Sequence, residues 1–197
     1  MTARPRLPQL ATLAITLTTF GAQAHTGHGT HSLMEGLTHP FGADHLLAMV
    51  AVGLWSASAL PSRQAWQGPA TFMLALVLSA IAGAMGFAPA FLEHAIALSV
   101  VLFGAMLVWP KTLPPTTGLA VIAAAASLHG LAHGAETPAS GFAGYAIGFL
   151  LSTAALHLLG VAAGLSLRRL LAERSRVALG GMGMAMAGAG VYLFSQI

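Results

Sequence analysis

Long apolar stretches dominate this sequence, and they decide what it can fold into. Of its 197 residues, 56% are hydrophobic and 7% are charged, whereas a soluble domain normally carries about a quarter charged residues. So few charges leave too little polar surface to cover a water-soluble fold. Backbone N–H and C=O groups must be satisfied within a segment that lies in lipid, so such stretches are expected to be helices. We therefore predict an all-α integral membrane protein, with the lipid bilayer as its first partner.

Six of these stretches are long enough to cross a bilayer, and short connections with Pro, Gly, Ser or charge separate them. We expect six transmembrane helices at about residues 33–60, 69–87, 91–109, 116–134, 140–167 and 177–194. No separate soluble domain remains between them. Residues 25–197 are therefore predicted to form one six-helix transmembrane domain.

The first 24 residues have the pattern of a secretory signal peptide. Arg4 and Arg6 give a positive start, an apolar stretch follows, and a small-x-small cleavage site ends at Ala24. The alternative is an uncleaved first helix, but this stretch contains several threonines and is short for a span. Cleavage after Ala24 would make His25 the mature N-terminus, on the outer side of the membrane.

The basic residues indicate the orientation. Without the signal peptide the chain has six basic and five acidic residues, and all six basic ones fall in the connections after the first, third and fifth stretches: Arg63, Lys111, Arg168, Arg169, Arg174 and Arg176. By the positive-inside rule, these connections are cytoplasmic and both mature termini lie outside. The basic residues are too few and too scattered for a nucleic-acid surface, so we expect no nucleic-acid partner.

Histidines and acids on the opposite side suggest a metal site. His129, His133 and Glu136 are spaced i, i+4 and i+7, which places two imidazoles and a carboxylate on one helical face. Asp44 precedes His45 and could act as a ligand or as an acceptor that orients an imidazole. There is no cysteine, and imidazole with carboxylate suits Ni²⁺, Co²⁺, Zn²⁺ or Cu²⁺ better than Cu⁺.

The depth of the remaining histidines in the membrane is estimated by counting residues back to the nearest cytoplasmic basic residue. At about 1.5 Å per residue, His94 has a similar height to His45 and His129, whereas His157 lies roughly 10 Å deeper. Glu93, His94 and His157 are candidate relay residues, and a structural role is an equal alternative for His94 and His157. Three further histidines precede the first span, where they could capture an incoming metal ion or belong to a polar tail: His25, His28 and His31.

Two segments resemble the hallmark motifs of the HupE/UreJ family of bacterial nickel permeases, and the resemblance covers essentially the whole chain. Residues 128–136, LHGLAHGAE, look like the family's HG-x-x-HG-x-E motif, with Leu128 where an aromatic residue is expected. Residues 39–53, which begin HPFGADH, are similar to the second hallmark. By this resemblance His39 joins the candidate metal ligands.

The second hallmark departs from the family pattern in its spacing. Four residues, rather than five, separate His39 from the Asp44-His45 pair. On an ideal helix one residue fewer rotates His39 by about 100°. Because His39 precedes Pro40, and Gly42 permits a break, an irregular entry to the span could absorb the change.

The resemblance implies nickel uptake across the bacterial cytoplasmic membrane for hydrogenase or urease maturation. Co²⁺ accepts the same ligands. We expect the metal to be cargo rather than a bound cofactor, and no enzymatic activity. The sequence has no P-loop motif, so we expect no ATP-driven step within this chain.

Several alternatives remain at this stage. The histidines could belong to an integral-membrane metalloenzyme, to a haem-binding membrane protein, or to a metal sensor or accessory subunit. The sequence also leaves open whether the protein forms a homo-oligomer. In the last span, Gly181, Ala185 and Ala189 predict a small-residue face for close helix contact.

Overall fold

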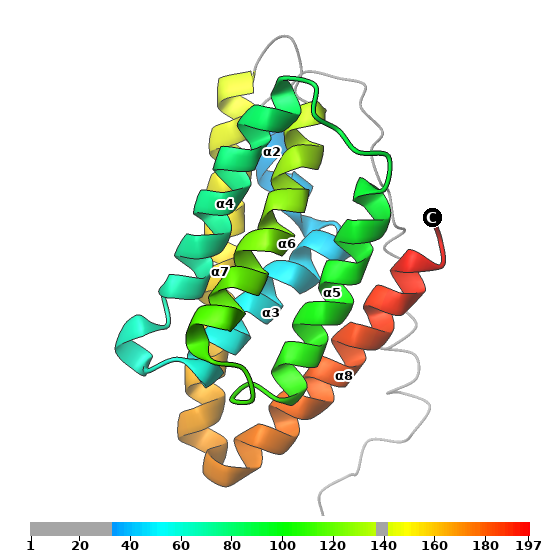
Figure 1. Cartoon of the computed structure of the whole chain (residues 1–197). Coiled ribbons are helices and arrows are strands. Elements are labelled where there is room, and N and C mark those ends of the chain that lie inside the picture. Colours follow the sequence, from blue (N-terminus) through cyan, green and yellow to red (C-terminus); the bar gives the residue numbers. More distant parts are fainter. Residues whose placement is uncertain (1–32, 137–141) are drawn as a thin grey trace, which may run out of the picture.

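The computed structural model describes residues 33–136 and 142–197, and these ranges contain helices and no strand (Figure 1). The all-α prediction is therefore confirmed. The predicted signal peptide, residues 1–24, lies outside the described residues. The elements in chain order are α2 (Leu33–Thr38), η1 (His39–Phe41), α3 (Ala43–Ala59), η2 (Ser62–Gln64), α4 (Gln67–Ala84), α5 (Leu92–Val108), α6 (Pro115–Ala135), α7 (Phe142–Leu171), η3 (Ala172–Arg174) and α8 (Ser175–Phe194).

The helices have the length and hydropathy of a multi-pass membrane protein. Three helical stretches in the described ranges could cross a membrane, and a bent pair makes a fourth candidate. The stretch Phe142–Phe194 contains both α7 and α8, which diverge from the turn at η3 (Figure 1). Helix α5 is apolar but slightly shorter. The number of spans is thus three or four by this criterion, and six remains a prediction.

Helix α3 is the central helix of the bundle. It packs mainly against α7 and also contacts α5 and α4, while α4 pairs with α6 and α5 pairs with α8 (Figure 1). Its buried residues run almost without a gap from Ala48 to Ser58. A helix that is apolar and buried all round belongs in a core. Polar side chains that face α3 are therefore surrounded by protein rather than by lipid.

The first apolar stretch is broken rather than continuous. Leu33–Phe41 and Ala43–Ala59 meet at an angle of 74°. Pro40 lies within η1, and Gly42 has the extended ψ of 142°, which cannot continue a helix. Because η1 and α3 lie on opposite sides of this bend, the spacing of a straight helix does not describe how His39 lies relative to His45.

Helix α8 contacts α5 through a different face from the predicted one. A Cβ atom on Gly183 would overlap the backbone oxygen of Gly104 in α5, and Gly190 packs similarly against Val101. A Cβ on Gly181 would meet nothing within 4 Å. The prediction of close contact through small residues was right in kind, but wrong by two residues, which is about 200° around a helix.

Candidate metal centre

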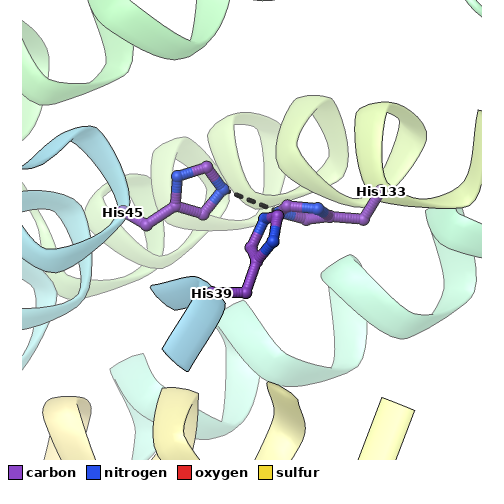
Figure 2. A group of neighbouring side chains, drawn as sticks. All are labelled: His39, His45 and His133. Atoms are coloured by element: carbon purple, nitrogen blue, oxygen red, sulfur yellow. Dashed lines mark hydrogen bonds between the residues drawn. The ribbon is translucent and has the colours of Figure 1, made fainter. Parts of the chain in front are cut away.

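Three histidines from separate elements converge inside the bundle. His39 comes from η1, His45 from the first turn of α3 and His133 from the last turn of α6. One ligand nitrogen from each lies within 4.8 Å of the other two, and the three rings point toward one another (Figure 2). The chain therefore gathers three imidazole donors at one point by folding.

Asp44 orients the imidazole of His45. Its Oδ1 atom accepts a hydrogen bond from His45 Nδ1–H at 2.9 Å. The lone pair of His45 is then on Nε2, which lies 2.7 Å from His133 Nε2 (Figure 2). The proton between these two nitrogens is assigned to His133. Metal ligation requires deprotonated nitrogens, so a bound cation would take the place of this proton between the two rings.

His129 lies one helical turn below His133 and is fully buried. Its ring centroid is 5.2 Å from that of His45. Ser99 of α5 donates its hydroxyl hydrogen to Ile96 O, so Ser99 Oγ accepts from His129 Nε2–H at 3.0 Å. This assigns the lone pair of His129 to Nδ1, which has no hydrogen-bond partner among the described residues. His129 thus offers a fourth imidazole donor beside the cluster.

His157 of α7 is also fully buried, but it does not touch the cluster directly. Its Nδ1–H donates to Thr153 O at 2.8 Å, and its Nε2 has no hydrogen-bond partner within the described ranges. Phe72 of α4 contacts both His157 and His129: its ring centroid is 4.8 Å from that of His157 and 5.6 Å from that of His129. The rings of two buried histidines, His129 and His157, thus pack against the same aromatic ring.

Three residues near the cluster of His39, His45 and His133 were not among the candidates from the sequence: Phe149, Tyr145 and Glu35. Phe149 of α7 packs 4.6 Å from the ring of His133, and Tyr145 lies 5.7 Å from that of His39, measured between centroids. Glu35 and Glu136 both interact electrostatically with Tyr145. The carboxylates of Glu35 and Glu136 therefore lie on the same side of the cluster as Tyr145. Of Phe149, Tyr145 and Glu35, only Glu35 had a usable signal in the sequence, because it precedes His39 by four residues.

The glycines of the HG-x-x-HG motif set the position of its histidines. A Cβ atom on Gly130 would overlap Leu76 O, and one on Gly134 would overlap Ala80 O, both in the backbone of α4. Each glycine therefore lets α6 lie directly against α4. The histidine that precedes each glycine projects away from this contact, toward α3. The motif combines close packing with ligand placement.

Not every candidate residue joins the cluster. Glu136 is exposed at the C-cap of α6, where φ and ψ of −91° and 8° depart from the helix, so the i+7 spacing no longer fixes its direction. His94 is exposed and lies against Phe194 of α8, with ring centroids 5.2 Å apart. Glu93 is partly buried at the start of α5 and outside the cluster. The proposed capture residues lie outside the described residues: His25, His28 and His31.

The fold and the site define a class: a multi-pass membrane protein with three histidine imidazoles whose donor atoms are close enough to share one metal ion. The chain belongs to the HupE / UreJ protein family, which matches residues 13–193. It is 38% identical over 170 residues to Protein HupE of Rhizobium leguminosarum bv. viciae, and this match covers 85% of the chain and 88% of that protein. No solved structure matches the chain. The resemblance inferred from the two motifs is thus confirmed.

Proposed function

We propose that this protein is a permease that brings Ni²⁺, or Co²⁺, across the bacterial cytoplasmic membrane for the maturation of a metalloenzyme. The observation that carries the proposal is the convergence of His39, His45 and His133, whose donor nitrogens lie within 4.8 Å inside an apolar bundle. Ionisable groups within spans are costly and usually mark a pathway or site. Family membership supports the same function, because the HupE/UreJ family is one of bacterial nickel permeases linked to hydrogenase and urease maturation.

The buried histidines suggest a sequence of ligand exchanges. The N-terminal histidines collect the ion, and the cluster of His39, His45 and His133 replaces part of its hydration shell. His129 receives the ion next, and His157 follows beyond Phe72. In this proposal the metal is cargo rather than a permanently bound cofactor, and the protein catalyses no reaction.

The membrane potential is sufficient to drive a divalent metal ion inward along these ligands. An inside-negative potential favours entry of a dication by about 4–5 kcal/mol per 100 mV. The protein then needs to lower the cost of dehydration, which the imidazoles do by substituting for water. We therefore propose facilitated diffusion rather than an ATP-driven pump.

The proposed topology has six spans after a cleaved signal peptide, with both mature termini in the periplasm. The basic connections lie at one end of the bundle, where α3, α5 and α7 end and α8 begins (Figure 1). The positive-inside rule assigns this end to the cytoplasm. N-terminal sequencing of the purified protein tests the first part, since the proposal expects a chain that starts at His25; a chain that retains Arg4 and Arg6 would contradict it.

Cellular uptake of radioactive nickel tests the function. His45→Ala and His133→Ala each remove one ligand from the cluster, so we expect uptake to fall to the background of cells without the protein. His94→Ala is the matched control, because it removes an exposed imidazole outside the cluster. Protein levels are compared by immunoblot. Near-normal uptake in both cluster variants would refute the assignment.

The alternative classes make different predictions for the purified protein. A haem would have to fit between two axial histidines, and the Nε2 atoms of His45 and His133 are only 2.7 Å apart. We expect no Soret band. A di-iron enzyme would retain two irons through purification, and metal analysis would reveal them.

A further inference from the structure

A second polar site lies at the basic end of the bundle, away from the histidines. A cavity of about 370 Å³ opens between the ends of α3, α5 and α7 and the start of α8. Three of the six basic residues in the described ranges line it: Lys111, Arg168 and Arg176. None of the five acidic residues does, although Glu173 lies nearby in the sequence.

The hydroxyl groups of the cavity wall carry no negative charge, and each is already engaged in a local hydrogen bond. Ser58 donates to Leu54 O, Thr112 to Trp109 O and Ser175 to Ala172 O, so each hydroxyl hydrogen is already used on a local carbonyl. The guanidinium of Arg168 is held in the wall, because its Nη1 donates to Ala57 O near the end of α3. Only one of its five N–H groups is needed for that bond.

The rest of the wall is apolar. Val108, Trp109 and Leu179 line the cavity beside the cations. A cavity with concentrated positive charge at the membrane end of a helical bundle, and with apolar surface next to it, suits an anionic group attached to a larger molecule. Basic pockets between transmembrane helices on the cytoplasmic side bind anionic headgroups in this way.

We propose that this cavity binds a phosphate group, supplied either by an anionic phospholipid headgroup or by a soluble phosphate compound. Arginine is suited to phosphate because its planar fork donates parallel hydrogen bonds to two oxygens, and lysine adds a point charge. The cavity volume lies in the range of small-molecule sites, about 300–1,000 Å³. Three positive charges repel a dication, so this cavity is separate from the proposed metal path, and the inference does not depend on nickel transport.

Binding to purified full-length protein tests the proposal. Native mass spectrometry measures retention of phosphatidylglycerol against phosphatidylcholine with the same acyl chains, and calorimetry measures binding of inorganic phosphate. The test variant is Lys111→Gln with Arg176→Gln, two exposed side chains that line the cavity. The matched control is Arg169→Gln with Arg174→Gln, which removes the same charge from the same end of the bundle outside the cavity.

We expect the cavity variant to bind about tenfold or more weakly, because it loses two charge-assisted contacts, while the control binds like the unaltered protein. A loss confined to phosphatidylglycerol would identify a lipid headgroup, and a loss confined to inorganic phosphate would identify a soluble ligand. Equal losses in both variants, or no binding of either probe, would overturn the proposal. If the double variant does not fold, the single substitutions at Lys111 and Arg176 are measured in its place.

Discussion

The contact between Asp44 and His45 gives a graded prediction for metal affinity. In the structure Asp44 acts on the metal site through His45, whose Nδ1–H it accepts at 2.9 Å. Loss of such an outer partner typically weakens metal binding 10–100-fold, which corresponds to about 1.4–2.8 kcal/mol. Asp44→Asn keeps an acceptor oxygen but loses the charge, so we expect about a tenfold weaker Kd for Ni²⁺. Asp44→Ala loses both, so we expect about a hundredfold.

Calorimetric titration of Ni²⁺ into detergent-solubilised protein measures these values, with His45→Ala as the reference for loss of a ligand. Glu173→Gln is the matched control, because it removes one carboxylate charge at the opposite end of the bundle and should leave Kd unchanged. If Asp44→Asn lost as much affinity as His45→Ala, Asp44 would be a direct ligand. If Asp44→Ala bound Ni²⁺ like the unaltered protein, the orienting role would be wrong.

Three further predictions concern the packing of α6 against α4, the buried His157 and the exposed His94. Gly134→Ala places a methyl group against Ala80 O, so we expect a loss of about 1–3 kcal/mol of stability, measured by thermal unfolding; Gly181→Ala meets open space and should melt like the parent. His157→Ala should preserve equilibrium Ni²⁺ binding but slow uptake, and a lost binding isotherm would instead place His157 in the primary site. His94→Ala should change neither quantity, and reduced affinity would show that the exposed ring of α5 reaches the metal.

Much of the candidate site was predictable because polar residues stand out in apolar stretches. His45, His129 and His133 are costly in lipid unless they are partnered, so their presence alone predicts a protein-lined site. Sequence spacing could not show that His45 and His133 meet at 2.7 Å, because that contact depends on the rotation and depth of two helices distant in the chain. Ser99 and Phe72 were missed for the same reason.

Local irregularities explain the other differences between prediction and structure. The 74° bend at Gly42 depends on how α2 packs against α7, although Pro40 and Gly42 indicated that a break was permitted. On α8, several small residues offered more than one close-packing face, and only the position of α5 selects the one that contains Gly183. Glu136 follows the helical spacing in the sequence, but α6 ends just before it.

Transport by the purified protein tests the central claim most directly. Proteoliposomes that contain only this chain, with an inside-negative potassium diffusion potential, are mixed with Ni²⁺, and the internal metal is followed with a trapped indicator. The account predicts uptake that depends on the potential and disappears in a variant with alanine at His39, His45 and His133. No uptake by the unaltered chain, or an equal rate in the triple variant, would contradict it.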